Sequence, residues 1–268
     1  MKNLLLAFLL LSLTYCQTKT ENMESNESNE PTEWVDENPP MDGFNFENSD
    51  PEAIVIADKV MKAMGGRKAW DETRYISWTF FGKRNLLWDK YTGDVRIEYL
   101  DRDENLLVNI HSLNGKASVD GIEIVQEDSL ASYLNKAKSI WINDSYWLVM
   151  PFKLKDSGVS LYYVGSDTTE VGQESYVLQL AFENVGDTPQ NIYHIWVDQE
   201  SNLVTQWGFY ESSENPHPDF ITPWENYEKH GNILLSGGRG KGSLTDIKVL
   251  DEVPKEVFTS FELNSNQK

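Results

Sequence analysis

The stretch Arg74-Tyr75-Ile76-Ser77-Trp78-Thr79-Phe80 decides the fold class, because its large apolar side chains alternate with smaller or polar ones. A period of two is typical of a strand that buries one face of a sheet. The same alternation returns over residues 95–99 and 106–110, and turn-forming residues separate these runs. Asn114-Gly115 is the strongest hairpin signal in the chain. The sequence therefore predicts a long antiparallel meander that begins near residue 74.

Two helical segments accompany this predicted meander. Asp50-Pro51-Glu52 indicates the start of the first helix, and Gly65-Gly66 indicates its end. The second segment covers residues 127–150, and Asn143-Asp144-Ser145 predicts the cap of a further turn within it. Short strands without a βαβ alternation argue against a nucleotide-binding α/β fold. Further strands are expected at about 159–165, 175–183, 190–198, 203–211, 232–236 and 243–249, with a tail near 257–263.

The N-terminus has the pattern of an export signal. Met1-Lys2-Asn3 carries one positive charge, and an apolar run follows up to Thr14, shorter than the roughly 20 residues that a membrane-spanning helix needs. Cys16, the only cysteine, stands at the expected processing point. The run Leu13-Thr14-Tyr15-Cys16 resembles the bacterial lipobox, although Tyr15 replaces the small residue usual there. We expect a signal peptide over residues 1–15 and a lipid anchor on Cys16; the alternative is an ordinary signal peptide with an accidental cysteine.

Composition predicts one acidic, globular domain behind a linker. Residues 16–50 are rich in Glu, Asn, Ser, Thr and Pro, which predicts a disordered acidic linker after the lipidated cysteine. With 40% hydrophobic residues the chain can bury a substantial core, and no boundary divides residues 51–263. Residues 264–268 form a short tail. The net charge of −20 makes nucleic acid a poor partner. A single cysteine excludes a disulfide scaffold and a cysteine-based zinc site.

No motif in the chain is a positive signal for catalysis, a metal or a cofactor. The run from Gly237 to Gly242 lacks the spacing of a phosphate-binding loop, so we expect a hairpin there. The acidic residues around Asp101 and Asp198 have calcium-loop spacing but lack the required glycine and glutamate, which favours hairpin tips. The four histidines are scattered, and no Gly-x-Ser-x-Gly elbow occurs.

The large aromatic residues are the remaining candidates for a binding site. Core packing explains most aromatic side chains in β proteins. A curved sheet, however, has an inner face where such side chains can line an apolar ligand cavity. The residues predicted to line this cavity are Trp78, Phe80, Trp88, Trp141, Trp147, Trp196 and Trp207.

Three longer stretches carry a family resemblance: residues 57–75, residues 147–159, and residues 195–205 with their continuation through 222–236. Over about 51–263 the chain resembles a family of uncharacterised lipoproteins common in Bacteroidota. More distantly it is similar to the LolA/LolB-type lipoprotein carriers, with Trp196-Val197-Asp198 and Asn202-Leu203-Val204 matching their hairpin. The resemblance implies a mainly β (α+β) fold. In that fold a single large curved antiparallel sheet forms an unclosed barrel, and an N-terminal helix and a second helical insertion cover its inner face.

The expected function follows from this resemblance and from the aromatic residues. We expect a non-enzymatic lipoprotein of the cell envelope, held at the outer membrane through Cys16 and facing either the periplasm or the surface. Its partner would be a lipid acyl chain or another hydrophobic small molecule. A surface glycan-binding module with exposed tryptophans is the main alternative, and an envelope hydrolase is less favoured. The oligomeric state stays open.

Overall fold

The computed structural model of this chain describes residues 36–183, 191–212 and 214–262. The predicted signal peptide, Cys16, the first part of the linker and the tail lie outside these residues. The described residues belong to one compact unit that starts at Asp36. None of the helices in these ranges is both long enough and apolar enough to cross a membrane.

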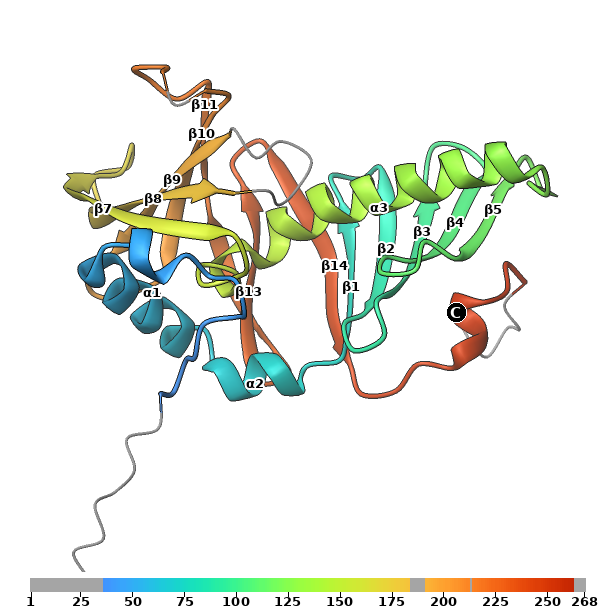
Figure 1. Ribbon diagram of the computed structural model, residues 1–268, viewed down its shortest axis with the longest axis horizontal. Coiled ribbons are helices and arrows are strands. Elements are labelled where there is room, and N and C mark those ends of the chain that lie inside the picture. Colours follow the sequence, from blue (N-terminus) through green and yellow to red (C-terminus); the bar gives the residue numbers. More distant parts are fainter. Residues whose placement is uncertain (1–35, 184–190, 213, 263–268) are drawn as a thin grey trace, which may run out of the picture. The chain divides into compact units, whose positions relative to one another are not determined.

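The strands form two antiparallel sheets that do not close into a barrel (Figure 1). The larger sheet contains, in spatial order, β12 (Glu225–His230), β13 (Ile233–Arg239), β14 (Gly242–Leu250), β1 (Tyr75–Phe80), β2 (Arg84–Asp89), β3 (Asp94–Tyr99), β4 (Glu104–Asn109), β5 (Gly115–Val119) and β6 (Ile122–Glu123). The smaller sheet contains β11 (Phe220–Pro223), β10 (Val204–Tyr210), β9 (Ile192–Asp198), β8 (Glu174–Phe182) and β7 (Val159–Thr168). Only Trp224 separates β11 from β12, so the chain passes from one sheet to the other at this buried residue.

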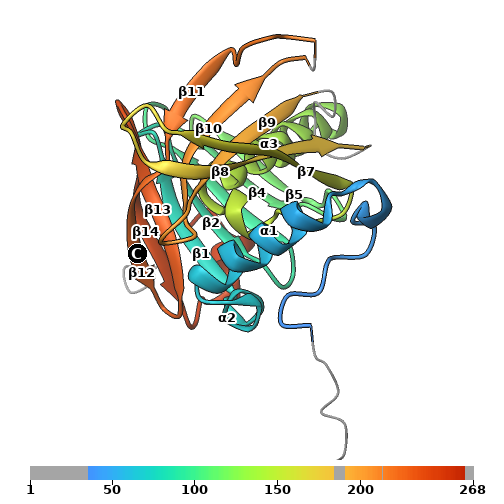
Figure 2. The same ribbon diagram turned by 90° about the vertical axis from the view of Figure 1, so that its left-hand side faces the viewer.

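Three α-helices accompany the sheets: α1 (Pro51–Ala63), α2 (Arg67–Glu72) and α3 (Glu127–Val149). Short 3-10 turns occur at η1 (Phe46–Asn48), η2 (Met150–Phe152) and η3 (Lys255–Phe258). Helix α1 begins where Asp50 is extended and Pro51 takes the first turn, and it packs against β7 and η2 (Figure 2). It ends just before Gly65, whose φ of +114° favours glycine and where a Cβ would lie 2.4 Å from the Asn232 carbonyl oxygen.

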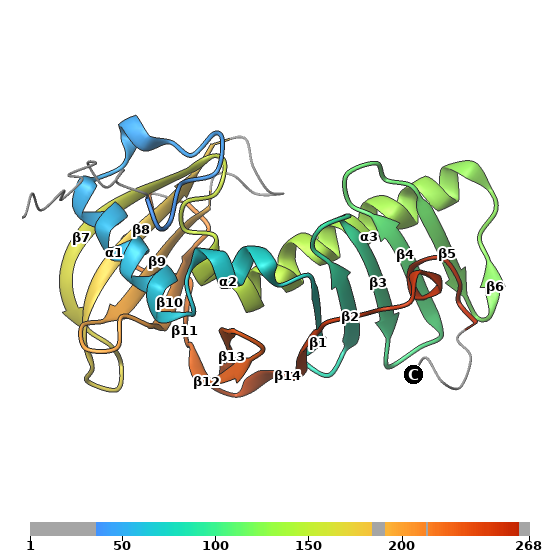
Figure 3. The ribbon, with the colours of Figure 1, turned by 90° about the horizontal axis from the view of Figure 1, so that it is seen from below.

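The larger sheet is covered on both faces. Helix α3 lies over β4 and β5 on one face, and η3 packs against β3 on the other (Figure 3). We call the face that α3 covers the inner face. Successive residues of β4 point to opposite faces of the sheet. Leu106 belongs to the main core beneath α3, whereas the equally buried Leu107 lies on the outer face and does not belong to that core. On the outer face the Arg96 guanidinium donates hydrogen bonds to the carbonyl oxygens of Val257 and Ser260.

The predicted architecture is confirmed: the fold is mainly β, its curved antiparallel sheets are unclosed, and helices cover the inner face. Backbone pairing divides the expected single sheet into two at Trp224. Strands β2, β11 and β12 are present although the sequence pattern does not predict them. The predicted strand tail near residue 257 is instead the 3-10 turn η3.

Two local predictions are wrong. The cap predicted at Asn143-Asp144-Ser145 is absent, since α3 runs unbroken through these residues and Asp144 pairs with Arg84 of β2 instead of capping a turn. Residues 36–50, assigned to the disordered linker, lie along the domain. Backbone amides of Met41, Asn45 and Asp50 donate to carbonyl oxygens between Lys155 and Leu161 at 2.8–3.0 Å. These hydrogen bonds give the segment an order that its polar composition does not predict.

Candidate functional site beneath helix α3

Helix α3 closes the inner face of the larger sheet and extends to β13 (Figure 1). Its start is capped by the Gln126 side chain, which accepts a hydrogen bond from the Ser129 amide at 2.7 Å. Leu134 and Ala137 are buried against the sheet, whereas most of the first three turns remain exposed or half-buried. The cover is therefore a single amphipathic helix with limited burial in its N-terminal half.

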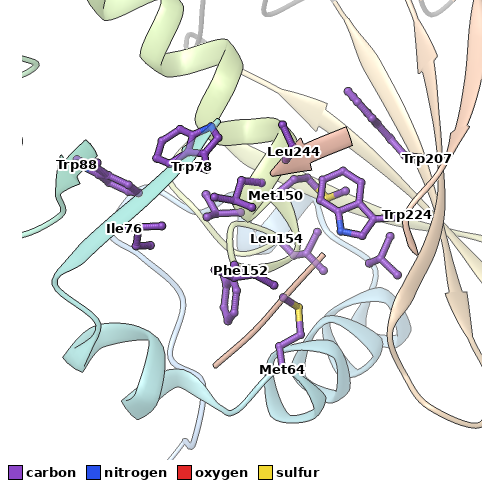
Figure 4. Close-up of a cluster of buried hydrophobic side chains, with 14 of the residues drawn as sticks. Met64, Ile76, Trp78, Trp88, Met150, Phe152, Leu154, Trp207, Trp224 and Leu244 are labelled. Carbon is purple, nitrogen blue, oxygen red and sulfur yellow. The ribbon is translucent and has the colours of Figure 1, made fainter. Parts of the chain in front are cut away.

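Six of the seven predicted cavity aromatics belong to one core beneath α3 or pack against it. Figure 4 shows three of them, Trp78, Trp88 and Trp207. Trp141 and Trp147 lie on α3 itself and are half-buried. The Trp141 ring packs edge-on against Trp88, with centroids 5.2 Å apart. The predicted residues that come from strands and are buried in this core are Trp78, Phe80, Trp88 and Trp207.

Trp196 lies apart from the others. It is buried, but on the opposite face of the smaller sheet, outside the main core. Its ring covers Gly208, where a Cβ would lie 3.3 Å from the ring and 3.5 Å from Pro218. His194 on the same face contacts Tyr210 and Gln179 at 3.1 and 3.2 Å. The structure therefore places Trp196 in a separate aromatic and polar patch.

The interior beneath α3 is filled by the protein's own side chains. Trp78, Met150 and Leu154 are each at most 2% exposed, and they fill the space between the sheets (Figure 4). A pocket beside α1, between Met61 and Phe152, has a volume of about 10 Å³, which is room for about one water molecule. The sequence predicts a hollow open to a guest, and here the described residues show a packed interior. A guest can enter this space only if α3 moves.

At the C-terminal end of α3, aromatic side chains from the helix and the smaller sheet form a continuous cluster. Trp147 packs edge-on against Trp207 at 4.6 Å and parallel to Phe220 at 6.1 Å. Tyr146 lies 5.5 Å from Tyr193. Because Phe220 is 39% exposed, this cluster reaches the protein surface at β11.

One polar link holds α3 to β2. Asp144 is fully buried, and its two carboxylate oxygens accept hydrogen bonds from Arg84 at 2.9 Å each. Such a bidentate pair is stronger and more directional than a single contact. Burial raises the pKa of the Asp144 carboxyl, and the hydrogen bonds from Arg84 oppose that rise.

A second polar link holds α3 to β4. The buried Glu104 carboxylate accepts hydrogen bonds from Lys136 of α3 at 2.6 Å and from Arg102 at 2.8 Å. Burial alone would raise the pKa of Glu104, but these two cations bring it below its ordinary value. The Arg102 guanidinium also lies 3.5 Å from the centre of the Tyr99 ring.

A third polar link lies at the C-terminal end of α3. Arg239, only 4% exposed, donates a hydrogen bond to the backbone carbonyl oxygen of Trp147. Its guanidinium stacks over the Trp224 ring at 3.5 Å. Burial lowers the pKa of Arg239 to about 9, so it stays a cation at neutral pH. The helix is thus fixed to β2, β4 and β13 through one buried polar group each.

Sequence reasoning missed the residues that make these links, namely Arg84, Glu104, Asp144 and Arg239. Asp144 left a usable signal, because it stands on the apolar face of the predicted helix, three residues after Trp141. The other three left none, since the contacts that join them to α3 are distant in the chain: Arg84 and Asp144 are 60 residues apart, Glu104 and Lys136 are 32 apart, and Arg239 and Trp147 are 92 apart.

No family model matches the sequence, and no curated protein matches it. The resemblance to Bacteroidota lipoproteins therefore stays a prediction. Among solved structures, the chain is similar to a DUF1329 family protein from Desulfovibrio piger, at 13% identity and a TM-score of 0.44, over 82% of this chain and 100% of that one.

Two further solved structures are similar to parts of the chain. An outer membrane lipoprotein-sorting protein domain from Vibrio parahaemolyticus shows 11% identity and a TM-score of 0.37, over 77% of this chain and 96% of that one. The Mycobacterium tuberculosis lipoprotein LppX shows 12% identity and a TM-score of 0.26, over 73% of this chain and 97% of that one. Likenesses of this strength carry no argument about function.

Proposed function

We propose that the chain is a non-enzymatic lipoprotein of the cell envelope that binds a lipid acyl chain between α3 and the inner face of the sheets. The observation that carries this proposal is the inner face itself, a continuous apolar and aromatic surface covered mainly by one helix. The half-buried residues of α3, such as Tyr133 and Trp141, supply the contacts that an acyl chain would replace. Cys16 would carry the lipid anchor at the outer membrane.

The energetics allow such a replacement. Removing apolar surface from water contributes about 25 cal/mol per Å², or about 0.8 kcal/mol for each buried methylene. An acyl chain of about twelve methylenes would therefore gain on the order of 10 kcal/mol. This gain opposes the cost of association, about 4–15 kcal/mol, and the cost of separating side chains such as Leu134 and Ala137 from the sheet, which stays small only if the acyl chain fills the same volume.

The positions of the tryptophans favour lipid over glycan. A sugar-binding platform needs exposed rings. In the part of the chain that the structure describes, every tryptophan is buried or half-buried, including Trp70, Trp141 and Trp147, the most accessible of them. The rings therefore suit an enclosed apolar ligand better than a saccharide in water.

The lipid proposal is tested on the chain without residues 1–16, which keeps the whole compact unit from Asp36 onward. The protein is analysed by native mass spectrometry and lipid extraction, and then titrated with a fluorescent fatty acid. We expect a co-purifying lipid or saturable fatty-acid binding. Absence of both would refute the proposed function.

A matched pair of variants shows where the lipid binds. Leu106 and Leu107 are neighbours on β4, each at most 1% exposed, but they face opposite sides of the sheet. Leu106→Phe should weaken fatty-acid binding because it enlarges the inner-face side chain where the acyl chain would lie. Leu107→Phe should disturb packing to a similar degree and leave binding unchanged. Equal effects of the two variants on binding would contradict the proposed location.

A further inference from the structure

Buried hydrogen-bond donors without partners occur in several parts of the described core, for example at the indole nitrogens of Trp78, Trp88 and Trp196, and some of them lie where the two sheets meet. Within the described residues, four such groups in this region have no hydrogen-bond partner: Nε of Arg239, Nε1 of Trp207, Nε1 of Trp224 and the hydroxyl of Tyr146. Buried polar groups are normally paired, so each of these groups is destabilising as it stands.

These four groups belong to one continuous cluster. The Arg239 guanidinium lies 3.5 Å from the centre of the Trp224 ring. The Trp224 ring lies 6.1 Å from Trp207, and Trp207 lies 6.4 Å from Tyr146. The cluster combines residues of β10, β13, the β11–β12 corner and α3.

Arg239 is the charged member, and among the described residues it has no carboxylate within ion-pair distance. Its terminal nitrogens donate only to Ser236 and to the backbone carbonyl oxygens of Trp147, Ser236 and Gly238. Other shielded arginines differ, since Arg84 pairs with Asp144 and Arg96 pairs with Glu98. Burial of an arginine without an anion is costly.

The Arg239 cluster thus holds a cation among carbonyl oxygens, one hydroxyl and aromatic rings, and Glu225 acts on it only from beyond ion-pair distance. An oxygen-rich anion would accept a hydrogen bond from the unpaired Nε of Arg239 and balance the charge. The adjoining surface is apolar, because Trp207 and Trp147 continue into the core beneath α3. A ligand that meets both demands has an acidic head and a hydrocarbon tail.

We propose that the Arg239 cluster binds the acidic head of an amphiphile, with a fatty-acid carboxylate as the simplest case. This inference rests on the proposed function, because the tail would lie between α3 and the inner face. The last turn of α3 must shift for the head to enter, since the Trp147 carbonyl oxygen now occupies one guanidinium nitrogen. The half-buried Trp147 and the exposed Phe220 stack at the rim, which leaves the head close to the surface.

The test compares three probes on the chain without residues 1–16: oleate, oleyl alcohol and inorganic phosphate. Binding is followed by tryptophan fluorescence and calorimetry. Charge-assisted hydrogen bonds to a buried cation should make oleate bind about tenfold or more tightly than the alcohol. Phosphate alone should bind far more weakly than oleate. Arg239→Gln should abolish the preference for oleate while changing alcohol binding by less than about threefold.

Arg96→Gln is the matched control, because Arg96 is also buried and bonded to backbone carbonyl oxygens but lies on the outer face. It should keep the preference for oleate. If Arg239→Gln does not fold, Trp207→Phe and Trp224→Phe replace it as tests. Each keeps an aromatic ring and loses one donor, and each should reduce the preference by a fewfold.

The outcomes separate the two proposals. Equal binding of oleate and alcohol by the unaltered protein, or an unchanged preference in Arg239→Gln, would overturn the head site and leave the acyl-binding proposal standing. Phosphate binding as tight as oleate binding would show a site for a free anion and also overturn the inference. If neither long-chain probe binds, the proposed function fails, and the head site fails with it.

Discussion

The link between Asp144 and Arg84 gives the sharpest prediction about how α3 is held. Asp144→Asn keeps the side-chain shape but removes the charge that faces Arg84, whose side chain is only 16% exposed. Two hydrogen bonds of 2.9 Å lose their ionic character. Breaking a buried pair by removing one partner costs about 3–5 kcal/mol. Because the introduced amide group would still accept one hydrogen bond, we expect the free energy of unfolding to fall by about 3 kcal/mol, the lower end of that range.

A double-mutant cycle measures this coupling by urea denaturation. Arg84→Met, Asp144→Asn and the double variant are compared with the unaltered protein, and the coupling energy should be about 2 kcal/mol or more. The exposed pair Lys68–Glu72 on α2, at 3.8 Å, is the control and should contribute less than about 1 kcal/mol. A coupling energy near zero for Arg84 and Asp144 would refute the idea that this pair fixes α3 to the sheet.

Three other perturbations test the second polar link, the core and the end of α1. The pKa of Glu104 in the folded protein is below its ordinary value of 4.5, so the unfolded chain binds a proton at this carboxyl more readily than the folded one. The stability that Glu104 contributes is therefore fully present above about pH 4.5, and it is lost as the pH falls through the lower pKa of the folded protein. Urea titrations should show that the difference in the free energy of unfolding between the unaltered protein and Glu104→Gln becomes smaller from pH 7 to pH 3. A difference that stays constant over this range would contradict the prediction. Trp78→Ala should lower the free energy of unfolding by about 3–5 kcal/mol, because it leaves a cavity at a side chain that is only 2% exposed. A decrease below about 1 kcal/mol in the same assay would show that the core is loosely packed. Gly65→Ala should lower the melting temperature more than Gly66→Ala does. Both glycines have a positive φ, but only at residue 65 would the added Cβ clash, 2.4 Å from the Asn232 carbonyl oxygen. Equal melting temperatures of the two variants would contradict this prediction.

The elements that the sequence predicts well are those with strong local signals. Helix α1 has a proline at its first turn and two glycines at its end, and in β1 the large apolar residues Ile76, Trp78 and Phe80 alternate with Ser77 and Thr79 in the sequence. The two missed strands beside Trp224 have weak alternation and mostly exposed or half-buried residues. Their pairing depends on β10 and β13, which local sequence does not reveal.

In the candidate site, too, some residues could be predicted from the sequence and others could not. Most of the predicted aromatics gather beneath α3, because apolar side chains on the inner positions of strands necessarily meet there. Trp196 falls on the other face since it stands one residue after the inward-facing Ile195. Arg239 and its partners could not be predicted, because a buried cation is recognised only when the elements that shield it are known. The filled interior likewise depends on how Met150 and Leu154 pack after α3 ends.

The central claim is that an acyl chain displaces α3 side chains from the inner face. Photolabelling tests it most directly: the protein binds a fatty acid with a diazirine in mid-chain, is irradiated, and the labelled residues are mapped by mass spectrometry. We predict label on Leu106, Ala117 and the facing residues of α3, and none on Leu107 of the outer face. Label confined to outer-face or surface residues, with the inner face unmodified, would contradict the claim.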